Sequence, residues 1–163
     1  MFARTVKLFG IGVALIFGST CKEPEDCGCP DDDHFAGLAR GANVVPLPTD
    51  TTPRGLVKLA TNLDANRIEW TVSLEVAPPG TIDSIALYAT PGMTTLPASA
   101  TAILCAGAAA CTATNGTAAI IAPANAATIK TSMRSYGTQV VFFTTTAQKS
   151  AGGAMRGTMF LNP

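Results

Sequence analysis

Residues 67–75, Arg-Ile-Glu-Trp-Thr-Val-Ser-Leu-Glu, decide the fold class of this 163-residue chain. Polar and apolar side chains alternate throughout the stretch, which is typical of a β-strand with one buried and one solvated face. The two glutamates on the solvated face, Glu69 and Glu75, are separated by ~20 Å at 3.3 Å per residue, too far for paired acid–base catalysis. The apolar face consists of Ile68, Trp70, Val72 and Leu74.

Further strands are predicted on both sides of this one. Residues 55–61 precede it across the turn-forming residues 62–66, which indicates a β-hairpin. Residues 138–145 include the run Val140–Phe143, which is apolar on both faces and therefore suits a central strand. We expect Trp70, Val141 and Phe143 to carry the core. The remaining expected strands are 84–89, 101–104, 117–122 and 153–161.

One short helix is expected before the strand at 138–145. Ile129, Met133 and Tyr136 recur at helical spacing, Asn125 is placed to cap the start, and Gly137 suits the end. The order of elements predicts a mainly β fold, an antiparallel Greek-key-like β-sandwich or barrel with one short helix before the penultimate strand.

The Ala-rich stretch from Pro97 to Ala127 is less informative. Its small side chains bury little area each, so outside the strands expected at 101–104 and 117–122 we expect mobile loops there. Asn115-Gly116 readily takes the positive φ angles of a tight type I′ turn, which predicts a hairpin. Asn115-Gly116-Thr117 also matches a glycosylation sequon. The turn is the preferred interpretation because the first 21 residues resemble a bacterial export signal, as described below.

Charge is sparse and unevenly distributed. The chain has 11 Lys and Arg against 11 Asp and Glu. From His34 onward there are eight basic and five acidic residues, and the basic ones neither cluster nor alternate with aromatics. That pattern argues against a nucleic-acid-binding protein.

The first 21 residues have the anatomy of a bacterial export signal. Arg4 and Lys7 precede an apolar run at 8–17, which is too short for a permanent membrane span of ~20 residues. Residues 18–21, Gly-Ser-Thr-Cys, resemble the lipobox of bacterial lipoproteins, although the usual Leu and the usual Gly or Ala are replaced by Gly18 and Thr20. We expect residues 1–21 to form the signal segment, with cleavage of the signal and Cys21 as the lipid-modified residue. Ordinary cleavage near Thr20 and an uncleaved anchor are the alternatives.

Residues 22–33 follow as an acidic tether before a domain at 34–163. They carry six acidic residues against one lysine and no apolar periodicity, so they cannot bury a face. Three adjacent aspartates at 31–33 could bind calcium, but the alternating ligands and distal Glu of an EF-hand loop are missing. A charged spacer is the preferred interpretation.

The cysteines indicate an oxidising compartment. With Cys21 lipidated, four remain, and they allow three pairings. Cys105 and Cys111 enclose only small residues and are expected to form a disulfide; Cys27 and Cys29 could pair with each other in a strained ring. A metal site is not expected, because only His34 is available to join the cysteines as a ligand.

The order of elements resembles the CHRD (chordin-type) domain over roughly residues 35–161. Residues 41–46, Gly-Ala-Asn-Val-Val-Pro, are similar to the family's opening Gly-x-Glu-Val-Pro-Pro. Residues 152–157, Gly-Gly-Ala-Met-Arg-Gly, are similar to its closing Gly-Glu-Ile-Arg-Gly strand. The resemblance implies a β-sandwich module.

The resemblance also shows what this chain lacks. The family commonly carries Ala-His-Ile-His on a middle strand and Val-His-Thr on the strand after the helix. The matching positions are 85–88, Ile-Ala-Leu-Tyr, and 142–144, Phe-Phe-Thr. Imidazole is the usual ligand for transition metals near neutral pH, so no metal or cofactor is expected.

These patterns predict a non-catalytic protein. His34, the chain's single histidine, lies beside the tether, and no glycine-rich phosphate loop precedes a helix. We expect an exported cell-envelope lipoprotein, at the outer membrane or alternatively periplasmic or secreted. Its domain would be a binding, adhesive or structural module for an unknown protein or glycan partner. A metal-binding or metal-dependent enzyme related to superoxide-dismutase-like sandwiches is the alternative.

Overall fold

The computed structural model describes residues 33–89, 95–147 and 152–162. The predictions for the export signal, for Cys21, for Cys27 and Cys29, and for the tether up to residue 32 lie outside the described residues. None of the helices in the described ranges is long and apolar enough to cross a membrane.

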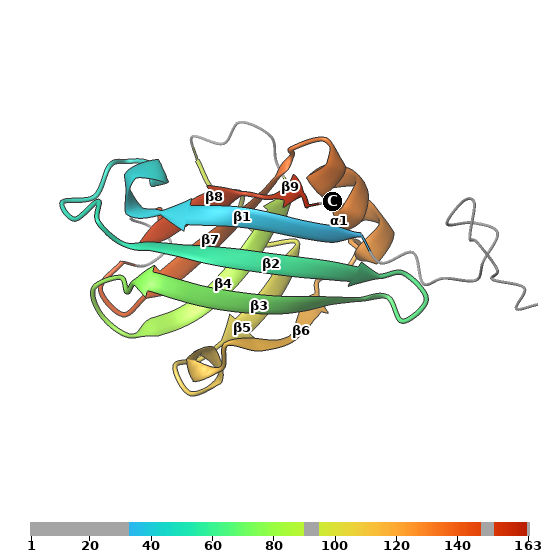
Figure 1. Ribbon diagram of the computed structural model, residues 1–163, viewed down its shortest axis with the longest axis horizontal. Coiled ribbons are helices and arrows are strands. Elements are labelled where there is room, and N and C mark those ends of the chain that lie inside the picture. The colour runs from blue at the N-terminus through green and yellow to red at the C-terminus, as the bar shows by residue number, and fades with distance from the viewer. Residues whose placement is uncertain (1–32, 90–94, 148–151, 163) are drawn as a thin grey trace, which may run out of the picture.

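The described residues form one antiparallel sheet that closes on itself (Figure 1). Its strands follow the order β2-β3-β6-β5-β4-β7-β8-β1, and β1 pairs back onto β2, which makes an eight-stranded barrel. A short ninth strand, β9, adds to β1. The strands are β1 (His34–Arg40), β2 (Arg54–Asn62), β3 (Arg67–Val76), β4 (Ile82–Ala89), β5 (Ala102–Ala106), β6 (Asn115–Ile120), β7 (Thr138–Thr144), β8 (Met155–Thr158) and β9 (Phe160–Leu161).

The connections confirm the predicted fold class. Strands β4, β5 and β6 follow one another along the chain and in space, and β7 returns to lie beside β4, which is a Greek-key arrangement. The helix α1 (Ala126–Arg134) precedes β7, the penultimate strand of the barrel. Two single-turn 3-10 helices, η1 (Gly41–Asn43) and η2 (Ala110–Thr112), lie in connections.

The predicted alternation of the first hairpin is found inside the barrel. Ile68, Trp70 and Val72 are buried and belong to the main core. Leu74 was expected beside them but is 39% exposed. Leu74 pairs with Gly55 in the same register as the rest of the hairpin, and the register shifts only beyond this pair, at Arg54. Leu74 therefore lies at the end of the regular β2–β3 pairing.

Strand β7 is buried on both faces, as its sequence predicts. Phe142 points into the main core, whereas Val141 and Phe143 join a second, smaller cluster with Ala86 and Tyr88 of β4. The second cluster therefore lies on the outer side of the β4–β7 wall, because successive side chains of a strand face opposite ways.

The helix starts where it was predicted. The Asn125 side chain accepts a hydrogen bond from the Thr128 amide at 2.9 Å, and Ile129 and Met133 are fully buried. Tyr136 was expected on the buried face but is 61% exposed. It follows the helix with a φ of +57°, so Tyr136 takes the left-handed terminating position for which Gly137 was expected.

The predicted hairpin turn at Asn115-Gly116 is wrong. Both residues begin β6, and Gly116 pairs with Trp70 of β3. A β-carbon on Gly116 would lie 3.0–3.1 Å from three atoms of the Trp70 indole ring, so the glycine provides space for the core tryptophan. The strands expected at 101–104 and 117–122 are found as β5 and β6, displaced by one or two residues and held by hydrogen bonds from neighbouring strands.

Strands form both ends of the domain. His34, expected at the domain edge with a surface or linker role, is exposed and begins β1, which pairs along its whole length with β2. The strand expected at 153–161 is divided into β8 and β9 at the buried residue Met159, whose amide donates to the Thr138 carbonyl at 3.0 Å.

Cys105 and Cys111 are joined by a disulfide, with their Cα atoms 5.3 Å apart. The bond links the end of β5 to η2 and fits the pairing expected from the small residues between them. It closes the connection that leads to β6.

Candidate functional site

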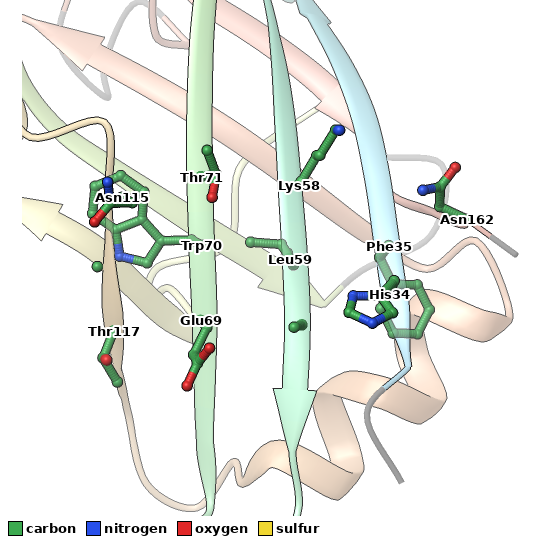
Figure 2. Close-up of a pocket in the computed structure, with 12 residues that line it drawn as sticks. His34, Phe35, Lys58, Leu59, Glu69, Trp70, Thr71, Asn115, Thr117 and Asn162 are labelled. Atoms are coloured by element: carbon green, nitrogen blue, oxygen red, sulfur yellow. The ribbon is translucent and has the colours of Figure 1, made fainter. Parts of the chain in front are cut away.

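A hollow of about 580 Å³ lies on the outer wall of the barrel, across β1, β2, β3 and β6 (Figure 2). The side chains that face it come from outward positions of these strands, where the residues alternate with core residues. The outward polar side chains around the hollow are His34, Lys58, Glu69, Thr71, Asn115 and Thr117, and Asn162 lies at one end.

Strand register places these side chains in two cross-strand rows. One row runs from His34 through Ala60 and Glu69 to Thr117, and each residue pairs directly with the next. In this row the methyl group of Ala60 lies between two longer polar side chains, which leaves the floor of the hollow low. The neighbouring row consists of Ala36, Lys58, Thr71 and Asn115.

The hollow carries both signs of charge. Arg67 donates to the Glu69 carboxylate at 2.8 Å, and both side chains are about half exposed. Lys58 extends from the adjacent strand, one row away from Glu69. Exposed ion pairs of this type contribute only ~0.2–1 kcal/mol to stability, so their side chains can exchange partners at low cost when a ligand binds.

The arrangement suits binding better than catalysis. His34 and Glu69 are two strand spacings apart across Ala60, ~10 Å between their backbones. A nucleophile and its base must approach within hydrogen-bonding reach, ~3 Å. The hollow presents carboxylate, ammonium, amide, hydroxyl and imidazole groups on a rigid sheet, and these groups recognise polar ligands through several hydrogen bonds.

An apolar margin borders the polar hollow. Leu38 of β1 and Leu56 of β2 are paired and face outward, and they are 40% and 37% exposed. They form the next row beyond Ala36 and Lys58. A ligand in the hollow would therefore meet polar groups and a small apolar surface side by side.

Sequence reasoning placed Glu69 on a solvated face but assigned no site there. The alternation of β2 and β3 does predict that Lys58, Glu69 and Thr71 face outward. Nothing in the sequence indicates that β1 and β6 flank this hairpin, and these strands supply His34, Asn115 and Thr117. The site is therefore visible only in the tertiary structure, which places β1 and β6 beside the β2–β3 hairpin.

The positions that the resemblance aligns with histidines meet at one place. Ala86, Tyr88 and Phe143 all lie in the outer cluster between β4 and β7. The rings of Tyr88 and Phe143 pack edge to face, with centroids 6.4 Å apart. Burial raises the pKa of the Tyr88 hydroxyl. This chain fills that place with apolar and aromatic packing.

Arg156 lies beside the same cluster, opposite Val141 of β7. It is only 3% exposed, and its guanidinium donates to the Gly152 carbonyl at 3.3 Å. Burial lowers the pKa of this guanidinium. Its stem packs against the wall and its head bonds locally, which is a structural role.

Within residues 33–89, 95–147 and 152–162, no three His, Cys, Asp or Glu side chains are grouped so that they could hold a metal ion. His34, the histidine considered as a ligand, faces the hollow from β1. No protein-family model, curated protein or solved structure matches the chain.

Proposed function

We propose that this protein is a non-catalytic cell-envelope lipoprotein whose CHRD-like barrel binds a glycan in the outer hollow. The observation that carries the proposal is the set of polar side chains that four strands direct into one open hollow of about 580 Å³. Ligand sites commonly have volumes of ~300–1,000 Å³ and a few convergent polar groups. Sugar hydroxyls both donate and accept hydrogen bonds, which matches the mixed lining.

The order of residues at the N-terminus supports membrane attachment. A basic start, an apolar run and small residues lead to Cys21. A diacylglyceryl group on this cysteine would supply two acyl chains, which suffice for stable anchoring where a single chain is marginal. Lys22 follows the cysteine instead of the aspartate that commonly retains lipoproteins at the inner membrane, so we favour the outer membrane.

Attachment is tested on protein isolated from bacterial membranes. Mass spectrometry of the mature N-terminus should find a diacylglyceryl-modified Cys21, and the protein should partition into detergent. Cys21→Ser is the control and should give an unmodified protein in the aqueous phase. An unmodified wild-type terminus in the aqueous phase would contradict the anchor.

Ligand binding is tested by screening the full chain on an array of bacterial-surface oligosaccharides, followed by titration with the best binder. Two glutamates of β3 give a matched pair of variants. Glu69 faces the hollow and is bonded to Arg67, whereas Glu75 lies outside it and is bonded to Arg54 at 2.6 Å.

Glu69→Gln should weaken binding about tenfold or more, because a hydrogen bond to a charged group is worth ~1.5–3 kcal/mol. Glu75→Gln should leave the affinity unchanged. Equal affinities of both variants, or no binding to any oligosaccharide, would contradict the glycan site. Stoichiometric binding of a purified envelope protein, abolished by Glu69→Gln, would assign the hollow to a protein partner instead.

The same preparation tests the non-catalytic interpretation. Metal analysis of the wild type and of His34→Ala should give the same result, without a stoichiometric transition metal. A metal present in the wild type and lost from His34→Ala would favour a metal-dependent activity.

A further inference from the structure

The end of the barrel where β1 begins carries an exposed aromatic and aliphatic surface. Tyr136, just after α1, packs against Phe160 of β9, with ring centroids 5.4 Å apart. Tyr136 is 61% exposed, and Phe160 and Leu161 are each 49% exposed. We call these three residues the aromatic edge. In Figure 1, α1, β9 and the C-terminus lie together at this end.

The N-terminal segment joins the domain at the same edge. Asp33 is held to α1 by Arg134 at 2.5 Å and Lys130 at 3.7 Å, and its carbonyl accepts from the Thr61 amide. One residue later, the His34 carbonyl accepts from the Asn162 amide at 2.8 Å, next to Leu161. The chain therefore leaves the barrel beside the aromatic edge, in a fixed place.

We propose that the aromatic edge docks on the surface of the lipid bilayer that anchors the protein; this rests on the proposed attachment through Cys21. Twelve residue steps separate Cys21 from Asp33, which span at most ~40 Å. The anchored end of the barrel therefore stays within ~40 Å of the headgroups, and this is the end that exposes the two aromatic rings.

The chemistry of the edge suits a bilayer interface. Tyrosine combines an apolar ring with a polar hydroxyl and is enriched at the level of lipid headgroups. Phe160 and Leu161 add apolar area that can enter the boundary between headgroups and acyl chains. In the free protein about half or more of each of these side chains is exposed to water, whereas a bilayer held within ~40 Å offers them an apolar phase.

The far end of the barrel provides a matched control. Leu47 lies in the connection between β1 and β2 and is 68% exposed, as apolar and accessible as the aromatic edge. Strand β1 separates the two ends by ~20 Å over its seven residues. A domain docked through the aromatic edge points Leu47 away from the lipid.

The experiment uses the full chain, reconstituted in vesicles of phosphatidylethanolamine and phosphatidylglycerol with brominated acyl chains, which quench nearby tryptophans. Three variants each add one tryptophan: Tyr136→Trp, Phe160→Trp and Leu47→Trp. The native Trp70 is 4% exposed and gives the same background in all of them. We expect Tyr136→Trp and Phe160→Trp to lose most of their added emission, and Leu47→Trp to retain it.

Several outcomes would overturn the proposal. Equal quenching at all three positions would mean that the domain has no preferred face toward the lipid. No quenching in protein whose Cys21 is shown by mass spectrometry to be lipidated would contradict docking while leaving the anchor intact. An unmodified Cys21 would overturn both. A dimer in detergent that dissociates on Phe160→Ser would assign the aromatic edge to a second copy of the chain.

Discussion

Replacing Gly157 with alanine should destabilise the barrel at the contact between β8 and β1. Gly157 lies on β8, next to Arg156, which forms the single registered pair between β8 and β1. A β-carbon at Gly157 would lie 2.6 Å from the Leu38 carbonyl oxygen and 2.9 Å from the Ala39 Cα atom. Both are main-chain atoms of β1, which cannot rotate away as a side chain would.

The close packing at Gly157 determines the expected loss in the free energy of unfolding. Inserting a methyl group into a filled site typically destabilises by ~1–3 kcal/mol, occasionally more. We expect about 3 kcal/mol, because the obstruction is backbone. This is a large part of the ~5–15 kcal/mol that keeps a domain folded. Each kcal/mol should lower the melting temperature by roughly 2–8 °C.

Urea unfolding of the full chain, followed by Trp70 fluorescence, measures the effect. Gly107→Ala is the comparison variant, because a β-carbon there would meet no atom within 4 Å but must adopt a φ of +84°. That backbone strain costs ~1–2 kcal/mol. Gly157→Ala should be the less stable of the two, and a Gly157→Ala variant as stable as the parent would refute the close approach of β8 and β1.

Three further predictions follow from buried groups. Trp70→Ala should lower the free energy of unfolding in urea by ~3–5 kcal/mol. Trp70→Phe should lower it less because, among the described residues, Trp70 Nε1 is buried with no hydrogen-bond partner and its removal breaks no hydrogen bond. Equal losses in the two variants would contradict this difference. Non-reducing peptide mapping should recover the Cys105–Cys111 link, and reduction should remove at most ~2–3 kcal/mol of stability; two freely alkylated thiols in envelope-derived protein would argue against the bond. Burial raises the pKa of Tyr88 above its ordinary 10.0, so the hydroxyl ionises first in the unfolded state. The free energy of unfolding should therefore fall as the pH rises above about 10. Tyr88→Phe should reduce this fall, and identical pH profiles of the two proteins would contradict the prediction.

The sequence determined the elements whose patterns are local. The alternation at 67–75 and its turn-linked partner predicted the β2–β3 hairpin, because period two needs only one buried face. Asn125 predicted the helix start, because a cap bonds to an amide three residues away. The apolar run Val140–Phe143 predicted a strand buried on both sides.

Pairing between distant strands determined two features that local sequence patterns could not predict. Asn115-Gly116 has strong turn chemistry, yet it became strand because Gly116 makes room for Trp70, 46 positions earlier in the chain. Leu74 is exposed at the end of the regular pairing with β2, where it lies opposite Gly55, and that position is a property of two strands together. Neither outcome can be obtained from the local segment.

The candidate site belongs to the tertiary structure for the same reason. Each strand of the outer wall contributes one or two ordinary polar residues, and none of them is distinctive along the sequence. Closure of the barrel brings His34, Glu69 and Thr117 into one row although they are far apart in the chain. The export signal predicted at residues 1–21, in contrast, is a contiguous pattern of the kind that other proteins recognise before folding, so that prediction depends on sequence alone.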